Sequence, residues 1–286
     1  MDGDAKIVID ELKICFIADA EQLNQLQQIS IGCYEDFYGY RFYRITNDRF
    51  RYYYEVSFDN QHMGIIKFGC YTDVEDAKTY VYYRVNNEVL YHEEALKSML
   101  DLPQRFGWLF NNYTAIDVAL DTKVNIPSII KKLMRNKDIT TIINGKALKE
   151  RKQIIKGLFF EYSSTLERLC HPSITIKQKK AEKNKNDGII VQAYDKKAEI
   201  TNNSDKEYIL DYNGNPKRLY RLEVRLHYRE LKDYFNSHGL VPDLGLVFSD
   251  DFLEDLFFYH LSSVVRFTKK RRKLDWRELL RCNGRV

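Results

Sequence analysis

The chain has 286 residues, of which 44% are hydrophobic and 30% are charged. This composition excludes a disordered chain, and the length predicts one large domain or two small ones. The formal net charge of +4 hides a gradient, because residues 1–122 carry −9, residues 123–197 carry +11 and residues 198–286 carry +2. The basic middle third predicts binding to a polyanion, with nucleic acid first, and a solvated lysine-rich surface is the alternative.

The sequence also excludes several classes of protein. Its five cysteines are scattered, without a CxxC pair or a histidine at metal-binding spacing, which argues against a disulfide framework and a zinc cage. No apolar run reaches the ~20 residues of a membrane span, and residues 1–13 lack the pattern of a signal peptide. We therefore expect a cytoplasmic protein without membrane association.

The first half of the chain is predicted to consist mainly of strands. Asp19 is a predicted N-cap for a helix over Asp19–Ser30, and Pro103 is expected to kink or divide a second helix over His92–Phe110. The predicted strands are Lys13–Ile17, Tyr38–Ile45, Phe50–Phe58, Gly64–Gly69 and Thr79–Val85.

In the second half, Pro127 is predicted to open a helix, Ser249 to cap another, and Lys179–Gly188 to form a polar loop. The predicted strands are Tyr113–Leu120, Ile139–Ile143, Leu158–Tyr162, Ser173–Lys177, Ile189–Tyr194 and Arg218–His227. Short hairpins between strands predict an α+β fold with largely antiparallel sheets and helices packed on them, and two related sheet-plus-helix halves would fit this layout. The expected segments are a strand-rich half over 1–111, a catalytic and DNA-binding half over 112–245, and a C-terminal helix with a basic tail over 246–286.

Common catalytic motifs are missing. The chain has no GxxxxGK[ST], GxGxxG, GxSxG or HExxH motif, and its six histidines never fall two to four residues apart. A metal site would therefore depend on carboxylates, which suit Mg²⁺ or Mn²⁺ and phosphate chemistry.

Three predicted strands each place charged or phenolic side chains on one face. These side chains are Asp117 and Asp121 in Ala115–Asp121, Tyr194 and Lys196 in Val191–Glu199, and Arg221, Glu223 and Arg225 in Arg221–Arg225. A carboxylate on a central strand costs several kcal/mol unless it is paired or bound to a metal. The pattern predicts a functional site, and the alternative is ion pairing of Asp117 and Glu223 with Arg221, Arg225 or Lys196 inside the fold.

The order of these three strings resembles the replication initiation factor family, the rolling-circle plasmid initiators and conjugative-element relaxases related to HUH endonucleases. The resemblance covers roughly residues 90–235. It departs from the family pattern at Ala115, where an arginine is usual, and at Thr175–Lys180, which replaces a hairpin of type Y-hydrophobic-G-S-R. If the family's nucleophile belongs to that hairpin, this chain lacks it. If the nucleophile is the tyrosine before Asp-Lys, Tyr194 retains it.

The resemblance implies an enzyme that nicks one DNA strand at an origin or transfer site, with DNA and a host helicase as partners. It implies Tyr194 as nucleophile, Asp117, Glu223 and Asp121 as ligands of Mg²⁺ or Mn²⁺, and Lys196 and Arg221 as phosphate contacts. The basic clusters separately predict DNA contacts by Lys177, Lys179, Lys180, Lys183, Lys269, Lys270, Arg271 and Arg272. The alternatives are a DNA-binding protein of the same fold that does not cut, and a structural or interaction domain.

Overall fold

The computed structural model describes residues 5–70, 79–147, 173–177, 188–282 and 284. Its strands are β1 (Ala5–Ala18), β2 (Tyr34–Phe37), β3 (Tyr40–Arg44), β4 (Phe50–Phe58), β5 (Gln61–Cys70), β6 (Thr79–Val85), β7 (Leu109–Thr122), β8 (Ile139–Ile143), β9 (Lys146–Ala147), β10 (Ile174–Lys177), β11 (Ile190–Asp195), β12 (Tyr220–His227), β13 (Val265–Lys269) and β14 (Arg272–Lys273). Its α-helices are α1 (Ala20–Gln28), α2 (Glu93–Arg105), α3 (Ile126–Arg135), α5 (Lys196–Asn203), α6 (Glu207–Tyr212), α7 (Tyr228–His238), α8 (Asp250–Val264) and α9 (Trp276–Arg281). Short 3₁₀ helices are η1 (Glu88–Tyr91) and η3 (Leu244–Phe248).

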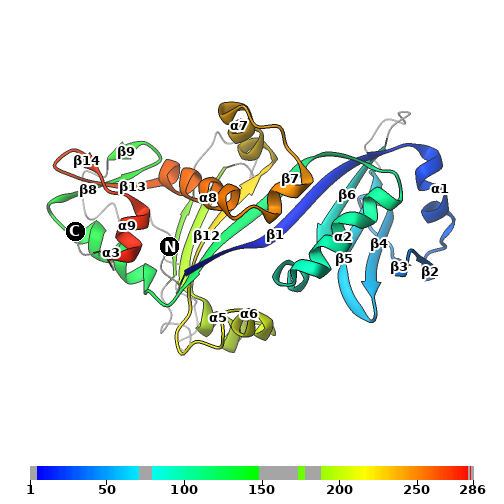
Figure 1. Cartoon of the computed structure of the whole chain (residues 1–286), viewed down its shortest axis with the longest axis horizontal. Coiled ribbons are helices and arrows are strands. Elements are labelled where there is room, and N and C mark those ends of the chain that lie inside the picture. Colours follow the sequence, from blue (N-terminus) through cyan, green and yellow to red (C-terminus); the bar gives the residue numbers. More distant parts are fainter. Residues whose placement is uncertain (1–4, 71–78, 148–172, 178–187, 283, 285–286) are drawn as a thin grey trace. The chain divides into compact units, whose positions relative to one another are not determined.

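The strands form two sheets (Figure 1). The larger sheet has ten strands in the order β10-β11-β12-β7-β1-β6-β5-β4-β3-β2, and the smaller has four in the order β14-β13-β8-β9. The paired strands run antiparallel and helices pack on the sheets, so the predicted α+β class is confirmed.

The chain divides into two compact units, and neither is one continuous segment. Unit 1 comprises Met1–Val8, Asp117–Glu230 and Val247–Val286, whereas unit 2 comprises Ile9–Ile116 and Leu231–Leu246.

In unit 2, helices α1 and α2 pack on one face of the sheet through buried aromatic side chains. The Tyr54 hydroxyl donates to the Leu26 carbonyl of α1 at 2.7 Å, and the Tyr83 hydroxyl donates to the Met99 carbonyl of α2 at 3.2 Å. Proline has no N–H, so Pro103 cannot donate to the carbonyl four residues before it, which is that of Met99. The Tyr83 hydroxyl supplies this carbonyl with a partner.

The predicted caps in unit 2 and unit 1 are both present. The Asp19 side chain accepts from the Gln22 N–H and completes a capping box, and the Ser249 hydroxyl accepts from the Phe252 N–H. The second predicted helix was too long, because α2 ends at Arg105 and Gly107 follows with a φ of 76° before β7 begins.

In unit 1, β10, β11, β12 and part of β7 form the sheet, α3 contacts β11 and β12, and α8 leads directly into β13 (Figure 1). Within the described ranges, no helix has the length and apolar character needed to cross a membrane.

The predicted strand Leu158–Tyr162 lies outside the described residues, as does nearly all of the predicted loop Lys179–Gly188.

Two predictions in unit 1 were wrong. The strand predicted over Ile189–Tyr194 is present as β11, but the strand alternation predicted to continue to Glu199 stops at Asp195, because the Asp195 carboxylate accepts from the Ala198 N–H and caps α5. The basic segment predicted as a tail is instead the hairpin of β13 and β14, followed by α9.

Candidate active site

A polar face runs across three neighbouring strands of unit 1. The register pairs Gln192 with Glu223 and Tyr194 with Arg221, so these side chains of β11 and β12 share one face of the sheet. β7 is the next strand, and alternation along it places Asp117 and Asp121 together on one face. On β12 the other face carries the buried Leu222, Val224 and Leu226, which anchor the strand in the core.

The centre of the polar face is a chain of contacts between four side chains. The Tyr194 hydroxyl donates to Glu223 Oε2 at 3.0 Å, and Glu223 Oε1 accepts from Arg225 Nε at 2.5 Å. The same Arg225 Nε lies 3.6 Å from Asp117 Oδ2. Glu223 therefore contacts both Tyr194 and Arg225, and Arg225 links Glu223 to Asp117. We call these four residues the tyrosine–carboxylate cluster.

Burial differs sharply within the tyrosine–carboxylate cluster. Glu223 is 1% exposed and Asp117 is 6% exposed, whereas the Arg225 side chain is 42% exposed. Partial burial would lower the pKa of Arg225, but the charges of Glu223 and Asp117 and the hydrogen bond to Glu223 outweigh it and raise the pKa. Arg225 is thus a fixed cation that reaches solvent at the edge of a buried carboxylate pair.

A second ion pair occupies the same polar face. Arg221 Nε and Nη2 donate to the two oxygens of Asp121 at 2.6 and 2.7 Å, and both side chains are 0% exposed. Asn213 Nδ2 also donates to Asp121 Oδ2 at 3.0 Å. In this arrangement Arg221 presents no surface to a phosphate, and both Asp121 oxygens are engaged, so the geometry favours the ion-pair alternative for these two residues.

Lys196 lies beside Tyr194 although it belongs to a helix and not to the strand. Its ammonium is 5.7 Å from the centre of the Tyr194 ring and 2.8 Å from Glu199 Oε2. The residue is 2% exposed. It therefore brings a buried cation to the tyrosine, while its ammonium forms an ion pair with Glu199 of the same helix.

The carboxylates fit a divalent ion only in part. In the described part of the chain, no three His, Cys, Asp or Glu side chains cluster closely enough to hold a metal. Asp117 and Glu223 offer the hard oxygen ligands that Mg²⁺ and Mn²⁺ prefer, but Arg225 pairs with both of them. Two carboxylates and one guanidinium leave a formal charge of about −1, which still favours a cation.

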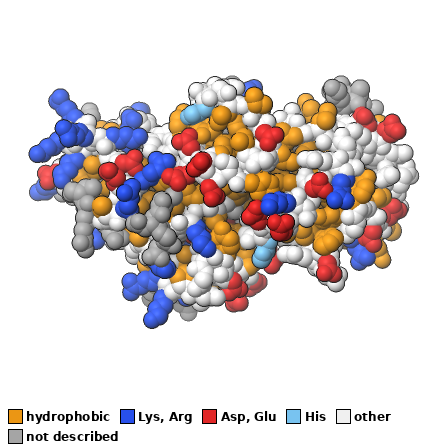
Figure 2. Space-filling view, in the orientation of Figure 1, with side chains coloured by type: hydrophobic (Ala, Val, Ile, Leu, Met, Phe, Trp, Pro, Cys, Tyr) orange, Lys and Arg blue, Asp and Glu red, His pale blue; other side chains and the backbone are white. Residues whose placement is uncertain are grey.

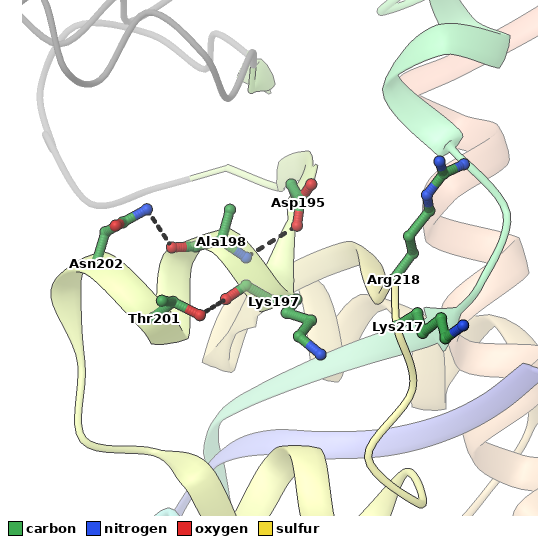
Figure 3. Close-up of a pocket in the computed structure, with 7 residues that line it drawn as sticks. All are labelled: Asp195, Lys197, Ala198, Thr201, Asn202, Lys217 and Arg218. Carbon is green, nitrogen blue, oxygen red and sulfur yellow. Dashed lines mark hydrogen bonds between the residues drawn. The ribbon is translucent and has the colours of Figure 1, made fainter.

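A pocket of about 350 Å³ lies next to the N-terminal turn of α5 (Figure 3). Its lining residues are Asp195, Lys197, Ala198, Thr201, Asn202, Lys217 and Arg218. Asp195 already caps the helix and Lys197 Nζ donates to the Pro216 carbonyl at 2.7 Å, so Lys217 and Arg218 are the lining cations that suit an anion such as a phosphate. The sequence analysis did not predict Lys217 and Arg218 as site residues. Their position between the Asn213–Pro216 turn and β12 is the only sequence feature that could have indicated them.

The β13–β14 hairpin carries a second basic surface. Lys270, Arg271, Arg272 and Lys273 are exposed, and Figure 2 shows lysine and arginine side chains gathered over the end of unit 1 that carries this hairpin. Lys269 pairs with Arg272, so the loop has only two residues, Lys270 and Arg271, with φ of 48° and 67°. Such turns favour Asn-Gly, and a long side chain in this conformation is strained.

The other predicted DNA contacts are outside what the structure describes. Lys179, Lys180 and Lys183 lie in the undescribed segment 178–187, and only the backbone of Lys177 is described, at the end of β10.

No protein-family model, curated protein or solved structure matches this chain.

Proposed function

We propose that unit 1 binds DNA and nicks one strand, with Tyr194 as the nucleophile. The observation that carries the proposal is the 3.0 Å hydrogen bond from the Tyr194 hydroxyl to the buried Glu223 carboxylate. A nucleophile within hydrogen-bond reach of a base, with the base held by a third group, is the arrangement that activates a hydroxyl. Arg225 is that third group here. The resemblance to replication initiators stated above supports the same reaction.

The proposed reaction is a transesterification of the DNA backbone. Tyr194 Oη bonds to phosphorus as its proton passes to Glu223, and the bond from phosphorus to the 3′ oxygen breaks. The products are a tyrosine joined to a 5′ phosphate and a strand with a free 3′ hydroxyl, whose oxygen takes up a proton. Positioned base catalysis of this kind contributes about 10²–10⁴-fold to a rate.

Charged groups around the tyrosine–carboxylate cluster support phosphate binding. Arg225 is partly exposed and offers guanidinium donors that match a phosphate. A divalent ion, when bound, would take the place of Arg225 between Asp117 and Glu223 Oε1 and would polarise the phosphate, while Glu223 Oε2 keeps its bond to Tyr194. Lys217, Arg218 and the β13–β14 hairpin are further cations of unit 1 that could contact the DNA backbone.

The direct test is covalent capture of DNA by the whole chain. The target sequence is unknown, so a pool of random-sequence single-stranded oligonucleotides is incubated with protein and Mn²⁺, and proteins are separated in SDS. A pool labelled at the 3′ end should label the protein, because the covalent product keeps the 3′ part of the strand. The same pool labelled at the 5′ end should not. If DNA binds but neither pool labels the protein, unit 1 is a binding module that does not cut.

Asp117→Asn should abolish stabilisation by a divalent ion. We expect Mn²⁺ to raise the melting temperature of the wild type and not that of the variant, because one of the two proposed oxygen ligands loses its charge. Asp101→Asn on the exposed surface of α2 is the control and should respond like the wild type. An equal shift in wild type and D117N, or no shift in either, would show that the two carboxylates serve the ion pair alone.

Lys270→Asn with Arg271→Gly should weaken binding to unrelated DNA. The pair removes two charges and supplies the residues that a turn with two positive φ values prefers, so stability should not fall. The slope of log affinity against log salt should become shallower by up to about 1.8 on duplex DNA. The control, Lys97→Gln with Arg105→Gln, removes two charges from α2. A slope unchanged from the wild type would exclude the hairpin from the DNA interface.

A further inference from the structure

From β2 to β6, one face of the unit 2 sheet carries aromatic and charged side chains that reach solvent, whereas Cys15 of β1, beside Tyr82 on the same face, is buried. The register places Tyr82 of β6 beside Lys67 of β5, and Lys67 beside Tyr53 of β4. A parallel row runs through Arg84, Ile65, Glu55, Tyr43 and Tyr34 on successive strands from β6 to β2. These residues alternate with the buried ones that meet α1 and α2, so they belong to the opposite face. We call them the open face.

Aromatic rings on the open face reach solvent. Tyr34, Tyr43 and Tyr80 are 56%, 40% and 49% exposed, and Tyr53 and Tyr82 are half-buried. Tyrosine and phenylalanine rings on a sheet offer flat surfaces on which unpaired bases stack. The core of the unit is formed by the buried residues of the other face.

Lys67 lies at the centre of this aromatic group. Its ammonium is 4.7 Å from the centre of the Phe50 ring and 6.0 Å from that of Tyr53, and the Phe50 and Tyr82 rings are 5.7 Å apart. Partial burial lowers the pKa of Lys67, and the charges of Lys13, Arg84 and Arg49 lower it further. Three further cations thus lie near Lys67, of which Lys13 and Arg84 pair with Glu11 at 2.9 and 3.1 Å, although residues 1–122 as a whole carry a net charge of −9.

We propose that the open face binds single-stranded DNA, with bases stacked on Tyr53 and Tyr82 and the backbone phosphate on Lys67. Neighbouring strands are about 4.8 Å apart, so the two rings flank the lysine at about 10 Å from each other. A duplex does not satisfy this arrangement, because its bases are stacked on one another and present no free ring faces. A face for a protein partner would be depleted in lysine.

This inference goes beyond the nicking reaction, since no residue of the tyrosine–carboxylate cluster takes part. Only the choice of DNA over RNA rests on the proposed function. A nicking enzyme releases a single strand, and a second surface that holds a single strand would keep it from pairing again.

Photocross-linking tests the location directly. A short deoxyuridine oligonucleotide substituted with 5-iodouracil is bound to the whole protein and irradiated, and the modified peptides are identified by mass spectrometry. Cross-links are expected in β4 at Tyr53 and in β6 at Tyr82. Cross-links confined to unit 1 would overturn the proposal.

Variants test the contribution of each group. Tyr53→Leu and Tyr82→Leu should each weaken binding of an oligo(dT) by at least about fivefold, the lower end of what one stacked base contributes. Lys67→Gln should flatten the salt slope by about 0.7. The controls are Phe58→Leu, an exposed ring at the end of β4 on the other face, and Lys97→Gln on α2.

The outcomes separate this proposal from the nicking reaction. Oligo(dT) affinity that falls equally in the open-face variants and the controls would overturn the open-face proposal, whether or not the protein forms a covalent adduct. Loss of oligo(dT) affinity in a chain that forms no adduct would support the open face and contradict nicking. Much tighter binding of oligo(U) than of oligo(dT), lost in the same variants, would overturn the choice of DNA.

Discussion

Tyr194→Phe should abolish the covalent protein–DNA adduct while leaving DNA binding intact. The substitution removes only the hydroxyl, which is the proposed attacking group and the donor to Glu223 at 3.0 Å. The ring stays in place beside Lys196, so the sheet keeps its packing. The loss should be complete under the assay that labels the wild type, because without an oxygen at this position the phosphotyrosine bond cannot form.

The matched control for this variant is Tyr220→Phe. Tyr220 lies on β12, opposite Asp195, and its hydroxyl accepts from Asn125 Nδ2 at 3.1 Å, so it loses a comparable hydrogen bond in the same sheet. Y220F should form the adduct like the wild type. Persistence of the adduct in Y194F would assign the chemistry to another tyrosine, with Tyr162, Tyr208, Tyr212 and Tyr220 as the next candidates, and loss of the adduct in Y220F would point to Tyr220.

Arg221→Met should cost about 3–5 kcal/mol in the free energy of unfolding, measured by urea denaturation at neutral pH. The reason is that Asp121 would remain as a charge in a site where it is 0% exposed. The control is Arg105→Met, which breaks the exposed pair with Asp101 and should cost less than about 1 kcal/mol.

Combining Arg221→Met with Asp121→Leu should recover most of this loss. Neither charge then remains in the buried site, and an apolar pair of similar volume is often as stable as the ion pair. Asn213 keeps a partner, because its amide also donates to the Ile209 carbonyl at 2.9 Å. If R221M costs no more than Arg105→Met, the Asp121–Arg221 pair contributes little to stability, and the phosphate-contact role predicted for Arg221 regains support.

The alternation of polar and apolar side chains along the strands predicted the polar face of unit 1 well. It placed Asp117 with Asp121, and Glu223 with Arg221 and Arg225. The register of β11 with β12 adds Tyr194 to this face, and the ion pairs of the two arginines connect it to β7. The caps at Asp19 and Ser249 were also predictable, because a short polar side chain just before a helix commonly accepts a hydrogen bond from a backbone N–H of the first turn.

What the sequence did not predict depends on contacts between distant residues. Alternation predicted that Lys196 continues the strand, but capping by Asp195 turned the chain into a helix there. The sequence also did not predict which carboxylate each arginine binds, because the order of the strands in the sheet decides it. Arg221 binds Asp121, whereas Arg225 binds Glu223 and Asp117. The Lys270–Arg271 turn lacks the Asn or Gly that usually marks a two-residue hairpin, so the basic run appeared to be a tail.

The discontinuity of the two units has a consequence for how the chain folds on the ribosome. β1 begins in unit 1 at Ala5–Val8 and continues in unit 2 from Ile9, and the Lys6 ammonium donates to the Tyr212 carbonyl at 2.7 Å. The first part of β1 is thus translated more than 200 residues before its partner. Unit 2 must wait for Leu231–Leu246, and unit 1 must wait for Val247–Val286. The strands β1 to β6 can pair with one another once residue 85 has emerged, but each compact unit stays incomplete until its last segment has been translated, so the late segments must add to a sheet that has already formed.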